Sequence, residues 1–218
     1  MPRWLYALVA ALLAVLWWAA HRNSAPLAAT GGAVGADTAC RVLQVPANLA
    51  GAVQSSQAAA PFRARDALFT PLAGFSVAAR VLSREDYHFD RESGYSPTDL
   101  ALGWGPMSAP GLAQRLSVSQ GGRWYRYRWD AAGPPLPPAV IATHSANMHM
   151  VPANAAVARA LAGIGAEDAL RIDGWLVRID ADDGWRWSSS LSREDTGTGS
   201  CELVLVCSVQ VAGQPVVR

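Results

Sequence analysis

Two segments of the chain carry side chains that can bind a metal ion or transfer protons. Asp86, His88 and Asp90 alternate along one extended segment, so their side chains project from the same face about 7 Å apart. A second segment, HSANMH, adds His144 and His149. Carboxylates and imidazoles together suit a divalent metal. These five residues are therefore a predicted site for a divalent metal, the one cofactor considered, and they would support a metal-dependent hydrolase.

The same alternation also has an interpretation that involves no chemistry. Asp86, His88 and Asp90 lie on the polar face of their segment, where charged side chains are simply solvated. Catalytic residues are not identified by spacing alone. Both interpretations stay open.

Two further polar segments lack the signatures of known sites. The acidic stretch 180–184 would need a glutamate at the twelfth position to form a calcium loop, and Leu191 stands there, so we expect a hairpin turn. Residues 188–200 are rich in serine, threonine and glycine, but the chain has no GxSxG motif and no lysine for a phosphate-binding loop. We expect a polar loop there.

Basic and aromatic residues alternate from Arg123 to Trp129. Single-strand nucleic-acid platforms show this pattern, but so does an amphipathic strand in which arginine stems cover apolar rings. The net charge of the chain is only +1, which gives no general reason to expect an acidic partner. We favour the amphipathic strand and expect no nucleic acid.

Hydrophobic periodicity predicts an α+β domain of five or six strands with two short helices. A partly open barrel of OB type is one topology that this order would suit. Strands are expected at 75–90, 116–129, 170–179, 185–190 and 201–211, and helices at 96–102 and 152–161.

The N-terminal part of the chain predicts an anchor and a tether. Residues 4–20 are an uncharged apolar run, and as a helix its 17 residues would span roughly 26 Å. Residues 1–22 are therefore predicted as a membrane anchor, with a cleaved signal peptide as the alternative. Residues 23–61 are predicted as a flexible tether rich in Ala, Gly and Ser, and residues 62–218 as an extracytoplasmic domain.

Three cysteines are too few for a disulfide framework. Cys201 and Cys207 lie about 20 Å apart in an extended strand and cannot bond to each other. Either of them could reach Cys40 in an oxidising compartment, but buried thiols are the expected state for both.

Three segments resemble a group of uncharacterised small bacterial proteins with an N-terminal hydrophobic segment: REDYHFDRESGYSPTDLALGWGPMS (84–108), HSANMHMVPA (144–153) and DGWRWSSSLSREDTGTGSCELVLV (183–206). The resemblance covers roughly residues 75–206 and implies a shared domain without a known activity. The relatives end soon after the strand similar to CELVLV, so the terminal CSVQVAGQPVVR is a departure.

These observations together predict a single-pass protein of the bacterial inner membrane whose C-terminal domain is extracytoplasmic. Its partners would be the lipid bilayer, through residues 4–20, and an envelope protein. Its function would be that of a binding or assembly module, and the metal-dependent hydrolase described above is the alternative.

Overall fold

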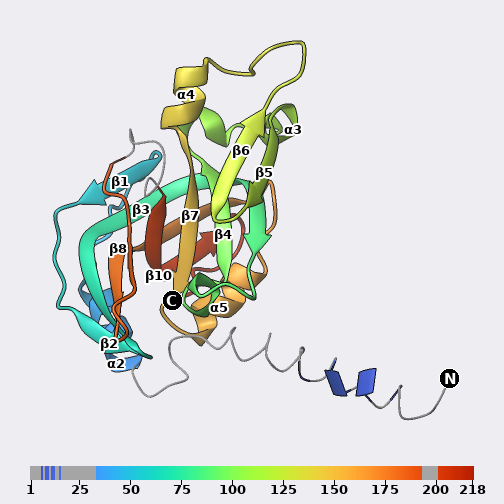
Figure 1. Ribbon diagram of the computed structural model, residues 1–218. Helices are drawn as coiled ribbons and strands as arrows, with labels where there is room; N and C mark the ends of the chain where they lie inside the picture. Colours follow the sequence, from blue (N-terminus) through green and yellow to red (C-terminus); the bar gives the residue numbers. More distant parts are fainter. Residues whose placement is uncertain (1–5, 7, 10, 13–14, 16–32, 193–200) are drawn as a thin grey trace.

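The computed structural model describes residues 33–192 and 201–218, together with isolated positions between 6 and 15. Ten strands run through these described residues, eight in one sheet and two in a separate ribbon (Figure 1). The strands are β1 (Ala52–Ser55), β2 (Phe62–Ala64), β3 (Ala67–Asp86), β4 (Thr98–Gly103), β5 (Ser117–Gly121), β6 (Trp124–Arg128), β7 (Ser145–Pro152), β8 (Ala169–Ala181), β9 (Arg186–Ser188) and β10 (Glu202–Val211). The helices are α2 (Ala33–Val42), α3 (Leu112–Arg115), α4 (Pro138–Thr143) and α5 (Ala155–Ala162), with 3-10 turns η2 (Glu92–Gly94) and η3 (Gly105–Ser108).

Five long strands close into a ring. β3 pairs with β4, β4 with β7, β7 with β10, β10 with β8, and β8 returns to β3. The pairing of β7 with β10 is parallel and the other four are antiparallel. Because β3 has 20 residues, its first part can pair with β8 while its last part pairs with β4. β1, β2 and β9 add to the ring at its margins.

The predicted fold class is wrong in several respects. The described residues hold ten strands and four α-helices rather than five or six strands and two helices, and the ring is closed by the β3–β8 seam rather than partly open. Strands of three or four residues, such as β1, β2 and β9, are too short for hydrophobic periodicity to reveal. The helix expected at residue 96 is instead β4, which pairs along its length with β3 and β7.

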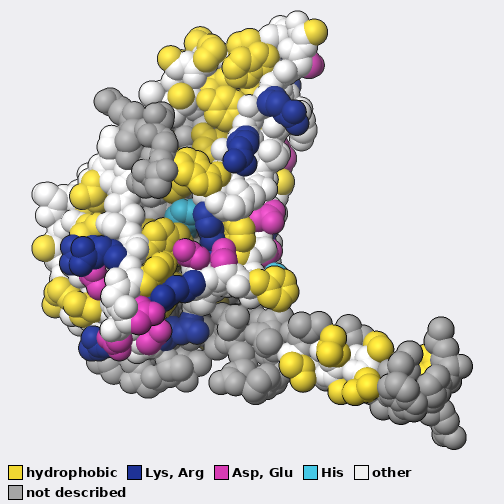
Figure 2. Space-filling view, viewed as in Figure 1, with side chains coloured by type: hydrophobic (Ala, Val, Ile, Leu, Met, Phe, Trp, Pro, Cys, Tyr) yellow, Lys and Arg dark blue, Asp and Glu magenta, His cyan; other side chains and the backbone are white. Residues whose placement is uncertain are grey.

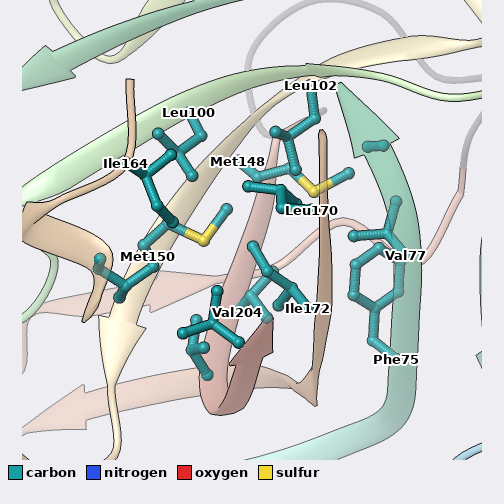
Figure 3. Close-up of a cluster of buried hydrophobic side chains, with 14 of the residues drawn as sticks. Phe75, Val77, Leu100, Leu102, Met148, Met150, Ile164, Leu170, Ile172 and Val204 are labelled. Atoms are coloured by element: carbon teal, nitrogen blue, oxygen red, sulfur yellow. The ribbon is translucent and has the colours of Figure 1, made fainter. Parts of the chain in front are cut away.

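The ring encloses an aliphatic core (Figure 3). Leu100 and Leu102 of β4 meet Met148 and Met150 of β7 there, because every second residue of a strand points inward. The residues between them face outward. On this outer face, apolar side chains of β8 and β10 pack under α2 in a second cluster, and the β5–β6 ribbon with α4 covers a third.

Gly174 of β8 lies in close contact with the backbone of β10. A Cβ atom at this position would lie 2.1 Å from the carbonyl oxygen of Leu205 on β10. We expect Gly174→Ala to lower the free energy of unfolding by about 1–3 kcal/mol, since backbone cannot move aside as a side chain can. Urea denaturation followed by circular dichroism measures this. Gly121→Ala is the control, because a Cβ there meets nothing within 4 Å, and equal losses in both variants would contradict the expectation.

The predicted transmembrane helix, and with it the single-pass inner-membrane location, is contradicted. In the part of the chain that the structure describes, no helix is long and apolar enough to cross a membrane. Most of the apolar run 4–20 lies outside the described residues.

Within the segment predicted as a tether, residues 33–42 form α2 and residues 52–55 form β1. The closed ring of strands forms a barrel, and Ala36 and Ala39 of α2 are buried against its outer face. A disulfide joins Cys40 of this helix to Cys207 of β10, with the Cα atoms 5.3 Å apart. The expectation of a thiol at Cys207 is therefore wrong, and the bond indicates an oxidising environment.

Candidate functional site

The structure does not gather the five residues predicted to hold a metal into one site, although Asp86 and His88 line the same pocket. β3 ends at Asp86, so the chain leaves the strand before His88 and Asp90, and their side chains no longer share one face. Asp86 accepts hydrogen bonds from Arg84 Nη2 (2.8 Å) and Thr98 Oγ1 (2.6 Å). The ring of His88 lies 6.2 Å from that of Phe89 in the loop that follows.

The two remaining histidines lie on different elements. His144 follows α4, where its Nδ1 is 3.1 Å from the carbonyl oxygen of Val140. His149 lies on β7 and is buried. Of the five predicted residues, only Asp90 and His149 belong to one hydrogen-bonded network. Among the described residues, no group of three or more His, Cys, Asp or Glu side chains could hold a metal ion.

Arg123 occupies the centre of that network. It is the second residue of the two-residue turn between β5 and β6, and both Gly122 (φ 59°) and Arg123 (φ 67°) adopt positive φ. This turn is of the kind that matches the twist of a hairpin. Positive φ is unusual for a residue other than glycine. Here the turn directs the guanidinium of Arg123 toward the acidic groups on the outer face of β4.

The guanidinium of Arg123 joins two carboxylates. Its Nε and Nη2 donate to the two oxygens of Asp90 at 2.9 and 2.8 Å, and its Nη1 donates to Asp99 Oδ1 at 2.9 Å. The ring of Tyr87 lies 3.8 Å from Cζ. Burial by itself raises the pKa of Asp90, but the hydrogen bonds and charge of Arg123 outweigh it and hold that pKa below its usual range. The guanidinium of Arg123 therefore occupies the space between Asp90 and Asp99 in which a metal ion bound by both carboxylates would lie.

Asp99 connects Arg123 to His149. Its side chain is fully buried, and it accepts from Asn147 Nδ2 at 3.0 Å and from His149 Nδ1 at 2.9 Å, besides Arg123. Gln120 Nε2 donates to Asn147 Oδ1 at 2.7 Å. An ionised carboxylate can only accept, so the hydrogen of a neutral His149 ring must be on Nδ1. Nε2 is then an acceptor.

The Nε2 atom of His149 has no hydrogen-bond partner among the described residues. The side chain of His149 is only 4% exposed, so little of the ring reaches the surface. Figure 2 shows basic, acidic and apolar side chains mixed over the visible face of the domain. The imidazole is thus fixed by Asp99 and almost fully enclosed.

Aromatic rings flank His149 on the side of the β8–β9 hairpin. The ring of Trp187 lies 4.8 Å from the imidazole and 6.0 Å from the ring of Trp185. Trp185 is stacked on Tyr95 at 5.7 Å, and the Cζ atom of Arg91 lies over its ring at 4.7 Å. Both tryptophans pack against the second apolar cluster and are partly exposed, and Trp187 is the one next to the imidazole.

The acidic turn 180–184 forms the tip of the β8–β9 hairpin, which confirms the turn. Arginines pair with its acids in each case: Arg178 with Asp180, Arg63 with Asp182 and Arg91 with Asp183. The hydrogen bond from Arg91 lowers the pKa of Asp183 to about 2. The segment 188–200 lies outside the described residues from position 193 onward.

Asp99 and Arg123 carry the network and were missed as site residues. The sequence pattern placed Asp99 in a segment expected to be helical, residues 96–102, and Arg123 at the start of a pattern read as an amphipathic strand. The signal that could have found Asp99 is the set of three segments 84–108, 144–153 and 183–206, because Asp99, His149 and Trp187 come one from each and meet here. Arg123 lies outside these segments.

Comparison of the chain with known protein families, with curated proteins and with solved structures finds no match. The geometry around His149 is therefore the basis for a function.

Proposed function

We propose that the protein is a binding module of an oxidising compartment, and that it recognises its ligand at His149 and Trp187 on the outer face of the barrel. The observation that carries the proposal is the second ring nitrogen of His149. Its Nδ1 is fixed by a fully buried carboxylate, while Nε2 has no partner among the described residues. Buried networks of this kind hold a side chain in one orientation before a ligand arrives.

The chemistry of the site defines the ligand that would fit. Nε2 of the tautomer set by Asp99 accepts a hydrogen bond, so the ligand presents an N–H or O–H donor. The partly exposed ring of Trp187 offers an apolar face 4.8 Å from the imidazole. A neutral ring compound with a hydroxyl or amide group satisfies both. An anion is disfavoured, because the carboxylates of Asp90 and Asp99 lie behind the surface.

The metal-dependent hydrolase finds less support in this arrangement. Such an enzyme would gather the predicted side chains in one cleft. Asp86 and His88 line a separate pocket and His144 follows α4, away from both. The guanidinium of Arg123 lies between Asp90 and Asp99.

The tautomer of His149 tests the first step of the proposal. We expect ¹⁵N spectra of imidazole-labelled protein to show His149 as the Nδ1–H form near neutral pH. Asp99→Asn should change this signature, because an amide can also donate to the ring. His144 is the internal control and should keep its spectrum. A His149 ring protonated only at Nε2 in the unaltered protein would contradict the proposed acceptor.

Protein labelled with ¹⁵N in the side chains of both histidine and tryptophan tests binding. A fragment library of ring compounds that carry hydroxyl or amide donors is added, and hits should shift the signals of His149 and Trp187 together. His149→Phe should abolish these hits, whereas His144→Phe should retain them. Hits that leave both signals unchanged would place recognition elsewhere and overturn the proposal.

A further inference from the structure

The β5–β6 ribbon leaves one strand edge unpaired. The ribbon stands apart from the eight-stranded sheet (Figure 1), and β6 pairs only with β5 among the described residues. In an antiparallel pair, every second residue directs its N–H and C=O groups away from the partner strand. With the two-residue turn at Gly122 and Arg123, these residues of β6 are Tyr125 and Tyr127. No backbone hydrogen bond from another described element reaches them, so this edge can accept a further strand.

The two faces of the ribbon differ in character. Tyr125 and Tyr127 lie on the inner face, where their rings are 5.8 Å apart and pack against the third apolar cluster. Because side chains alternate along a strand, Arg126 and Arg128 project from the outer face, and both are exposed. A strand that joined this edge would therefore place its side chains alternately beside arginines and beside aromatic rings.

The outer face of the ribbon has a net positive charge. Arg126 and Arg128 form no ion pair with any described residue, and the residues opposite them on β5 are Ser119 and Ser117. The nearest acid in the sequence, Asp130, lies beyond the end of β6 and accepts from the backbone of the turn that follows. Figure 2 shows basic side chains over the part of the surface where Figure 1 places the ribbon, and the C-terminus lies away from it. Two guanidiniums against one carboxylate favour a partner with negative charge.

The charge pattern decides which strand fits the edge. A second copy of β6 is disfavoured, because its own Arg126 and Arg128 would lie beside the same arginines and repel them. The complement carries acids on the face of the arginines and apolar residues on the face of Tyr125 and Tyr127. Trp129 extends this second face, since its ring lies 6.3 Å from that of Tyr127 and its residue is 40% exposed.

From these observations we infer that the edge of β6 binds an extended peptide in which acidic and apolar residues alternate, and that this peptide adds a third strand to the ribbon. Main-chain hydrogen bonds supply affinity and the alternating side chains supply selectivity. Acids two residues apart in an extended peptide are separated by about 7 Å, the same spacing as that of Arg126 and Arg128 along β6. This surface does not include His149 and does not depend on the function proposed there.

Fluorescence anisotropy of a short labelled peptide that alternates glutamate and valine, titrated with the disulfide-bonded full chain, tests the inference. This peptide should bind, and its affinity should fall as salt is added. A peptide that alternates lysine and valine should bind at least about tenfold more weakly, because its charges repel the two arginines. Equal affinity for the two peptides, or the absence of any binding of the acidic peptide, would overturn the inference.

Methylation of the peptide backbone tests strand addition itself. An added strand directs the N–H groups of only every second residue toward β6. N-methylation of all valines or of all glutamates should therefore abolish binding in one series and spare it in the other. Equal effects in the two series would overturn the inference. An oligothymidylate that bound as tightly as the acidic peptide would also overturn it, because the ribbon would then be a general surface for polyanions.

Variants locate the binding. Arg126→Ala and Arg128→Ala should each weaken binding of the acidic peptide about two- to fivefold, as expected for the loss of one exposed ion pair. Arg126→Glu/Arg128→Glu should reverse the preference, so that the lysine peptide binds more tightly than the acidic one. Arg159→Ala is the matched control, since Arg159 is an exposed arginine of α5. His149→Phe should also leave the affinity unchanged, which separates this surface from the proposed function. An unaltered preference in the double glutamate variant would overturn the inference.

Discussion

Replacing Arg123 with alanine is expected to lower the free energy of unfolding by about 3–5 kcal/mol. The side chain of Asp99 is fully buried, and Arg123 supplies the only guanidinium in contact with it among the described residues. Removing the guanidinium leaves a carboxylate in the interior without its counter-ion. It also removes the bidentate pair with Asp90 and the stacking on Tyr87.

Urea denaturation at neutral pH measures this loss. Arg126→Ala is the matched control, since Arg126 is an exposed arginine of the same ribbon and should change stability by less than about 0.5 kcal/mol. A second variant, Arg123→Ala/Asp99→Leu, should recover part of the loss because no buried charge is left. A loss below about 1 kcal/mol in Arg123→Ala would mean that the network is weakly coupled to folding.

Breaking the Cys40–Cys207 bond is expected to cost about 2–5 kcal/mol of stability. The bond joins residues 167 positions apart, so the loop that it closes in the unfolded chain is long. Cys207→Ala in the chain, or reduction of the unaltered protein, should give similar losses in thermal or urea denaturation. Measuring the stability of both proteins under oxidising and under reducing conditions separates the effect of losing the disulfide from the effect of the substitution itself.

Cys201→Ala controls for the loss of a sulfur atom. Cys201 is partly buried and takes no part in the disulfide, so this variant should respond to reducing agent as the unaltered protein does. Cys207→Ala, in contrast, should show no response. If the stability of the unaltered protein were the same with and without reducing agent, α2 would be held by its packing and by Trp175 alone.

The strands of the ring could be predicted where one face is apolar. The segment in which Phe75, Val77 and Val81 alternate with other residues is part of β3. The apolar run after Cys201 forms β10, a central strand. The hairpin turn at 180–184 was also predicted, because glycine permits the positive φ found at Gly184. These signals are local, so periodicity and turn chemistry reveal them.

The segment around Asp99 shows why other parts could not be predicted. Ser96, Pro97 and Asp99 have the side chains of a helix start, but pairing with two neighbouring strands outweighs this local preference. Once residue 99 lies in a strand, its register sets it directly opposite His149. Neither the register of β4 against β7 nor the turn that directs Arg123 follows from the residues nearby. The network was therefore not predicted, although two of its members, Asp90 and His149, were predicted site residues.

The seam between β3 and β8 has a consequence for how the chain folds. Ala67 pairs with Ala181 and Arg80 with Ala169, so the ring closes through contacts between residues far apart in the sequence. Domains of high contact order fold in milliseconds to seconds, because loop entropy is lost before native contacts form. Until β8 has emerged from the ribosome, the long strand β3 has an unpaired edge. The early part of the chain is thus exposed to aggregation until synthesis is nearly complete, and protection by a chaperone during that interval would raise its yield.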